Sequence, residues 1–149
     1  MPGLSSRIEA ARARVGARAL SLGGFAVGLA AVPLIALGHF WIALGVLLAG
    51  RAIALLGDSD GGLDAVLFAS LPFAFALADP SRAVAAAFLL FAFVASTATT
   101  RRLERIDGYV ALAGFALACL LPERFGLIAY AMGVACFVVA GLRFAKVLA

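Results

Sequence analysis

Charged residues are scarce in this chain. Asp, Glu, Lys and Arg together make up 13% of its 149 residues, which is about half the share in an average soluble domain. Hydrophobic residues make up 65%, and a soluble domain of this length has too little interior to bury them all. The composition excludes a soluble globular enzyme and a disordered chain, and it predicts a helical membrane protein.

Histidine and cysteine are nearly absent. His39 is the single histidine, and Cys119 and Cys136 are the two cysteines, so we expect neither a disulfide scaffold nor a His/Cys metal site. Both cysteines lie within apolar runs, where buried thiols are expected. His39 lies close to Trp41 at the edge of an apolar run, which is typical of the membrane–water interface.

Six apolar segments have lengths near the roughly 20 helical residues that cross a bilayer. They are continuous and rich in Ala and Leu rather than alternating, which favours helices over strands. The expected spans are Ala19–Leu37, Phe40–Leu56, Gly61–Ala78, Ala83–Ala98, Tyr109–Leu121 and Phe125–Leu142. Gly24 and Gly28 in the first span form a small-xxx-small pattern that allows close helix packing. The predicted fold is an all-α bundle of six transmembrane helices over residues 19–149.

The arginines predict the orientation of the bundle. The formal net charge is +4, and every basic residue except Lys146 is an arginine. With the N-terminus inside, ten of the twelve basic residues fall on the inner side, and Arg82 and Arg124 fall outside. This asymmetry predicts that both termini are cytoplasmic. Because the arginines are explained by topology, we expect no nucleic-acid binding.

Residues 1–18 are predicted to form a short amphipathic helix at the inner membrane surface. Apolar residues and arginines fall on different helical faces, namely Leu4, Ile8, Ala11 and Val15 on one and Arg7, Arg14 and Arg18 on the other. Apolar insertion and anionic lipid would hold such a helix at the interface. The alternative is a positively charged flank with no helix of its own.

Three aspartates, Asp58, Asp60 and Asp64, lie at the inner start of the third span. If the helix begins near Asp60, then Asp60 and Asp64 share a face and Asp64 lies about one turn inside the membrane. A charge there is unfavourable, and a divalent cation such as Mg²⁺ or Mn²⁺ would neutralise it. Helix capping is the alternative explanation, and it accounts for Asp58 and Asp60 better than for Asp64.

Three arginines on the same side are candidate phosphate ligands, because the guanidinium fork matches phosphate oxygens. Arg51 lies near the inner end of the second span, where it either reaches the interface or pairs with Asp58 or Asp60. Arg101 and Arg102 lie in a polar inner segment. For these two, a solvated loop is the alternative explanation.

The aspartate cluster resembles part of the CDP-alcohol phosphatidyltransferase family, whose pattern is D-x2-D-G-x2-A-R-x8-G-x3-D-x3-D. Asp60 and Asp64 match the closing D-x3-D. Residues 20–29, 71–80 and 119–122 also resemble a bacterial branch of this family. The first half of the pattern is absent, because the chain reads Arg51-Ala52-Ile53-Ala54-Leu55-Leu56-Gly57-Asp58 there. A register that takes Asp60-Gly61 as the D-G pair loses the match downstream.

The resemblance implies an enzyme of the inner membrane that moves a phospho-alcohol group from a CDP-linked donor to an acceptor alcohol in phospholipid synthesis. It implies Mg²⁺ or Mn²⁺ held by Asp58, Asp60 and Asp64, with Asp64 also acting as the catalytic base. It further implies phosphate binding by Arg51, Arg101 or Arg102, membrane lipid as a partner, and a homodimer.

Two other functions fit the same sequence. The missing half of the pattern favours a non-catalytic six-span relative that binds lipid or partner proteins. A small transporter with the aspartates as an ion site is the third hypothesis. The chain lacks the internal repeat of broken helices that many transporters show.

Overall fold

The computed structural model describes the backbone of residues 4–57, 61–99 and 105–148, and the side chains of residues 13–57, 61–99 and 108–146. The described segments are helical almost throughout, and no strand occurs within them. The predicted all-α fold class is confirmed.

The first two passes form a helical hairpin. α1 (Leu4–Leu29) is followed by α2 (Ala31–Ala36), and α3 (Phe40–Leu55) returns alongside α1. Pro33 explains the short interruption at Ala30, because a proline ring clashes with the carbonyl group four residues earlier. Gly38 makes the reversal with a φ of 80°, which glycine adopts without strain.

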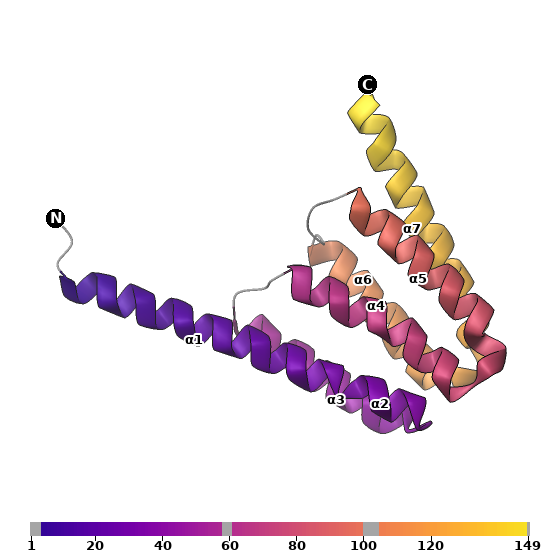
Figure 1. Ribbon diagram of the computed structural model, residues 1–149, viewed down its shortest axis with the longest axis horizontal. Coiled ribbons are helices and arrows are strands. Elements are labelled where there is room, and N and C mark those ends of the chain that lie inside the picture. Colours follow the sequence, from indigo (N-terminus) through magenta and orange to yellow (C-terminus); the bar gives the residue numbers. More distant parts are fainter. Residues whose placement is uncertain (1–3, 58–60, 100–104, 149) are drawn as a thin grey trace.

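The N-terminal segment is part of α1 rather than a separate helix. Residues 4–18 are helical, as the amphipathic pattern predicts, but no break follows residue 18 and α1 runs for 26 residues. No proline lies between Pro2 and Pro33 to end the helix. The first half of α1 therefore extends away from the bundle (Figure 1).

The other four passes form two helical hairpins, each joined by a short 3₁₀ turn. α4 (Gly61–Ala78) leads through the 3₁₀ turn η1 (Pro80–Arg82) to α5 (Ala83–Ala98). α6 (Arg105–Leu120) leads through η2 (Pro122–Arg124) to α7 (Phe125–Leu148). A proline opens each turn, because the first residue of a helix needs no N–H donor.

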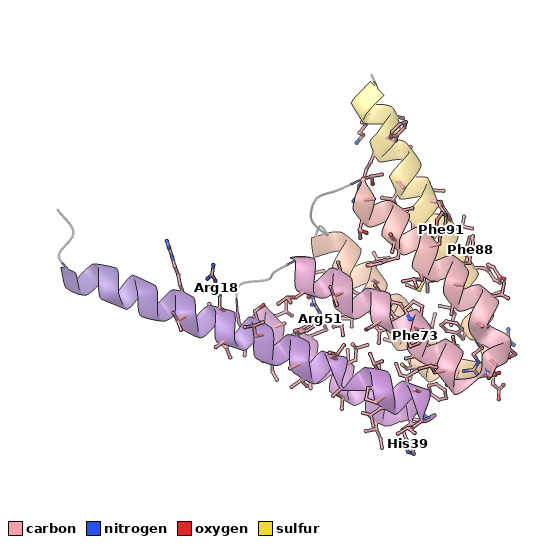
Figure 2. The ribbon with its side chains drawn as sticks, in the orientation of Figure 1. Arg18, His39, Arg51, Phe73, Phe88 and Phe91 are labelled. Atoms are coloured by element: carbon pink, nitrogen blue, oxygen red, sulfur yellow. The ribbon has the colours of Figure 1, made fainter. Side chains whose placement is uncertain are left out.

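The two ends of the bundle differ in what they carry. We call the end with η1, η2 and the α2–α3 turn the His39 end, and the opposite end, where α3 finishes and α4 begins, the Arg51 end. Both residues are labelled in Figure 2. In the predicted orientation, the Arg51 end faces the cytoplasm.

α4 is the central helix of the bundle (Figure 1). It packs against α1, α2, α5 and α6, while α1 pairs closely with α3 and α5 with α7. Its buried residues are Leu67, Phe68, Leu71, Pro72, Ala74 and Phe75. The first turn of α4, which carries Asp64, is therefore surrounded by other helices at the Arg51 end.

α1 and α3 touch backbone to backbone. A Cβ atom on Gly24 would lie 2.5 Å from the backbone nitrogen of Ala54, and one on Gly50 would lie 2.5 Å from that of Gly28. Neither position has room for a side chain. The close packing predicted from Gly24 and Gly28 is confirmed, and Gly50 is its partner on α3.

Stacked aromatic rings join the three hairpins at the His39 end. The ring of Phe75 on α4 lies 5.7 Å from that of Phe40 on α3 and 4.4 Å from that of Phe125 on α7, centroid to centroid. Phe75 is fully buried. One side chain of the central helix thus contacts all three hairpins.

The outer surface is apolar along its length. Four helical stretches are long and apolar enough to cross a membrane: Ala13–Ala36, Gly61–Ala78, Pro80–Ala98 and Pro122–Lys146. Two shorter apolar helices, Phe40–Leu55 and Gly108–Leu120, complete the six predicted passes. Phe73 and Phe91, both labelled in Figure 2, are 59% and 67% exposed, which suits lipid rather than water. The chain is an all-α membrane protein.

Candidate functional site

The Arg51 end holds an ion pair between the first two hairpins. Nη1 of Arg51 donates a hydrogen bond to Oδ1 of Asp64 and forms a salt bridge with it. Arg51 lies one turn before the end of α3, and Asp64 lies in the first turn of α4. In Figure 2 the Arg51 side chain lies between these helices.

Local sequence explains why the two residues meet. α3 and α4 are joined by a short connection, and the two residues stand at nearly equal distances from it. Both residues therefore lie at the end of the bundle where α3 finishes and α4 begins, and their side chains meet there. The structure therefore gives Arg51 a partner in Asp64, whereas the sequence analysis considered Asp58 and Asp60.

The ion pair is largely removed from solvent, with Arg51 buried and Asp64 partly buried. The side chains of Arg51 and Asp64 are 10% and 19% exposed. A buried charge without a partner is strongly unfavourable, and breaking a buried pair by removing one member costs about 3–5 kcal/mol. Each residue therefore makes the presence of the other tolerable inside the bundle.

Aromatic packing fixes the guanidinium group further. Its central carbon lies 5.6 Å from the centroid of the Phe68 ring, within cation–π range. Phe68 is fully buried and stacks on Phe115 of α6 at 6.1 Å. Nε of Arg51 is buried and has no hydrogen-bond partner among the described residues. Arg51 thus keeps an unused donor in a rigid, apolar setting.

The structure places Asp64 close to where the sequence predicted it along the helix. The sequence analysis started the helix near Asp60 and placed Asp64 about one turn inside. α4 is described from Gly61, and Asp64 lies in its first turn. The partial positive charge at a helix N-terminus therefore also favours its carboxylate.

Four of the six candidate site residues lie outside the described residues: Asp58, Asp60, Arg101 and Arg102. Among the side chains that the structure describes, no group of three His, Cys, Asp or Glu residues could hold a metal ion. Mg²⁺ takes six oxygen ligands, several of them usually waters, and is commonly held by one or two carboxylates. Asp64 offers one carboxylate, and Arg51 binds its Oδ1. Among the described residues it is therefore the positive charge of Arg51, next to the carboxylate, that does not fit a divalent metal at Asp64.

A second polar group lies at the His39 end and was missed from the sequence. Oδ1 of Asp79 accepts hydrogen bonds from the Ser81 backbone N–H at 3.0 Å and from its hydroxyl at 2.7 Å. Both hydrogen bonds lower the pKa of Asp79 below its usual 3.8, and the bond from the Ser81 hydroxyl has the larger effect. The Asp-Pro-Ser-Arg run was the available signal, because Asp before a proline turn often bonds the backbone two residues on.

Arg82 completes this second group. Its Nε lies 3.2 Å from Oδ2 of Asp79, and its guanidinium carbon lies 5.8 Å from the centroid of the Phe40 ring. Asp79 and Arg82 also line an open pocket together with Ser81, Val84, Ala85, Glu123, Gly126 and Tyr130. The pocket brings η1 and η2 together, and it lies at the opposite end from Asp64.

The remaining polar candidates are structural. Cys119 is buried and Cys136 is partly buried, in line with the expectation of buried thiols. His39 and Trp41 are both exposed at the end of the bundle. This placement agrees with the interfacial role expected from their position.

Comparison with known proteins gives one informative relative. No family model and no solved structure matches the chain. Inner membrane protein YnjF of Escherichia coli (strain K12) is 30% identical over an alignment of 156 residues, which covers 79% of this chain and 76% of YnjF. The description of YnjF as an inner membrane protein agrees with the apolar helices described above. The chain belongs to the same family as inner membrane protein YnjF.

Proposed function

We propose that this chain is an inner-membrane protein of the CDP-alcohol phosphatidyltransferase type. It would transfer a phospho-alcohol group from a CDP-linked lipid precursor to an acceptor alcohol at the Arg51 end. The observation that carries the proposal is the Arg51–Asp64 pair, in which a guanidinium group lies beside a carboxylate. The resemblance around Asp60 and Asp64 and the inner-membrane relative support it.

The reaction needs two groups that this pair supplies. The acceptor hydroxyl oxygen forms a bond to the phosphorus that carries the alcohol, while the pyrophosphate bond breaks and CMP leaves with the electron pair. Asp64 takes the hydroxyl proton through Oδ2, because Oδ1 is bound to Arg51. Arg51 binds a phosphate oxygen and stabilises the negative charge of the transition state.

The resemblance also implies Mg²⁺ or Mn²⁺. Because the described residues do not fit a divalent ion at Asp64, no step above uses one. Asp58 and Asp60 are the remaining candidate ligands for this metal ion, and Arg101 and Arg102 are further candidate phosphate ligands. In the predicted topology all four residues lie on the cytoplasmic side of the membrane.

The test is CMP release by the purified full-length protein in lipid nanodiscs. The substrates are CDP-diacylglycerol with glycerol 3-phosphate, serine or inositol phosphate, in the presence of Mg²⁺ or Mn²⁺. We expect CMP release by the wild type and a fall of about 100-fold or more in Asp64→Asn. Asp79→Asn is the matched control, because it removes a carboxylate at the opposite end, and it should retain the wild-type rate.

Two outcomes would contradict parts of this proposal. Absence of CMP release from the wild type with every acceptor removes the transferase function. Release that is unchanged in Asp64→Asn removes Asp64 from the role of base but leaves the transferase function standing.

A second candidate function is a non-catalytic lipid-binding relative. The occupation of Asp64 by Arg51 favours it, because a carboxylate bound to a guanidinium is a weaker base. This function predicts phospholipid that co-purifies with the wild type and no CMP release. Native mass spectrometry of wild-type and Arg51→Gln protein measures the bound lipid, and equal lipid content in both would contradict a role for Arg51.

A further inference from the structure

We infer that Arg51 is the built-in cation of the Asp64 carboxylate and takes the place that a divalent metal ion would occupy there. Asp64 then binds no metal, whatever the role of Asp58 and Asp60. The inference concerns the same site as the proposed function, but it rests on the geometry of the ion pair and is tested separately.

The charges facing Asp64 carry the first step. α3 contributes no acidic residue from Phe40 to Leu55, so through Arg51 it offers Asp64 a cation and no additional metal ligand. A metal at Asp64 would lie beside the Arg51 guanidinium, and two cations a few ångströms apart repel strongly in a medium of low dielectric constant.

The rigidity of Arg51 carries the second step. Its side chain is 10% exposed and rests against the buried ring of Phe68. Its neighbour Gly50 is packed against the backbone of α1, where a Cβ would lie 2.5 Å from the nitrogen of Gly28. α3 therefore cannot shift toward α1 to withdraw Arg51 from Asp64. A metal would have to leave the guanidinium buried and unpaired, which is strongly unfavourable.

The test is Mn²⁺ binding to the purified full-length protein, measured from the electron paramagnetic resonance signal of free Mn²⁺. We expect the same Mn²⁺ affinity and stoichiometry in the wild type and in Asp64→Asn. Arg51→Gln frees the carboxylate, and we expect it to raise Mn²⁺ affinity at least about tenfold. The double variant Arg51→Gln/Asp64→Asn should return to the wild-type affinity.

A fall in Mn²⁺ affinity of tenfold or more in Asp64→Asn would overturn the inference, because it would make Asp64 a metal ligand in the intact site. If either single variant fails to fold, the comparison between wild type and double variant decides, since the double variant removes both charges together. Equal affinity supports the inference and a loss contradicts it. Failure of CMP release affects only the transferase proposal, since Mn²⁺ binding is measured without substrate.

Discussion

At the scale of single residues, charge in this bundle is balanced over two different distances. Arg51 and Asp64 are 13 residues apart and meet across a helix interface. Asp79, Ser81 and Arg82 balance one another within a single turn. The first pair depends on packing, and the second depends mainly on local backbone geometry.

The hydrogen bonds to Asp79 in the η1 turn predict how the stability of the protein changes with pH. A carboxyl whose pKa is lower in the folded state adds stability above its unfolded pKa, and this contribution is lost as pH falls through the folded value. Asp79 has such a lowered pKa, so its contribution is lost below pH 3.8. Because the hydrogen bond from the Ser81 hydroxyl lowers the pKa of Asp79 most, we expect Ser81→Ala to raise that pKa toward 3.8.

NMR titration of the Asp79 carboxyl carbon measures this effect. Thr97→Ala is the control, because the Thr97 hydroxyl donates to the nearby carbonyl of Val94 on α5 and not to Asp79. An unchanged Asp79 pKa in Ser81→Ala would show that the hydroxyl does not hold the carboxylate.

The residues that carry the site were predictable, but their partners were not. Asp64 and Arg51 were selected because a charged residue within an apolar run is energetically unfavourable and often marks a functional site. The partner of Arg51 depends on how α3 and α4 are placed relative to each other, and the apolar pattern of the sequence does not specify this placement. The roles predicted for Asp58, Asp60, Arg101 and Arg102 stay predictions.

At the scale of elements, glycine sets the distance between α1 and α3. Gly50→Ala places a methyl group against the backbone of α1, so the helices must separate. Overpacking of this kind costs about 1–3 kcal/mol. Gly45→Ala is the matched control on the same helix, because nothing lies within 4 Å of its Cβ position.

The measurement is the free energy of unfolding in mixed micelles with increasing sodium dodecyl sulfate. We expect a loss for Gly50→Ala and a change near zero for Gly45→Ala. Equal stability of the two variants would mean that α1 and α3 do not pack backbone to backbone.

The buried ring of Phe75 gives a second prediction about how the helices pack. Its ring joins α3, α4 and α7 in one stack, so Phe75→Ala leaves a cavity among three hairpins. Such a change costs about 3–5 kcal/mol in a buried site. Phe73→Ala on the same helix removes a ring that is 59% exposed, and it should cost far less in the same unfolding assay. A reversed order would place the core on the other face of α4.

Helix positions were largely predictable from apolar runs, since each expected span falls on an observed helical stretch, although α1 begins at Leu4 rather than Ala19 and α7 runs on to Leu148. Two features were not. The sequence shows nothing at residue 18 that ends a helix, so the amphipathic segment and the first span fuse into α1. Pro33 lies inside the first run, and its effect on Ala30 was not anticipated.

At the scale of the whole molecule, the distribution of arginine predicts the orientation in the membrane. Six predicted passes would put both termini on one side, and ten of the twelve basic residues would fall on that side. The positive-inside rule predicts that this side is the cytoplasm. This predicted topology needs only the order of apolar runs and charges, while the pairing of helices around α4 depends on side-chain packing that composition does not encode.

Reporter fusions in a bacterial host test this topology. We expect green fluorescent protein fused after Ala149 to fluoresce and alkaline phosphatase at the same point to be inactive. Alkaline phosphatase inserted after Ser81, in the turn at the His39 end, should be active. An active phosphatase at the C-terminus would reverse the orientation and place Asp64 on the outer side.

The coupling between Arg51 and Asp64 is the most direct test of the account, because both proposals depend on this pair. The free energy of unfolding is measured for wild type, Arg51→Gln, Asp64→Asn and the double variant. We expect each single change to cost about 3 kcal/mol and the double change to cost less than their sum by at least about 1 kcal/mol. Costs that simply add would show that the two side chains do not interact, and they would contradict the site described here.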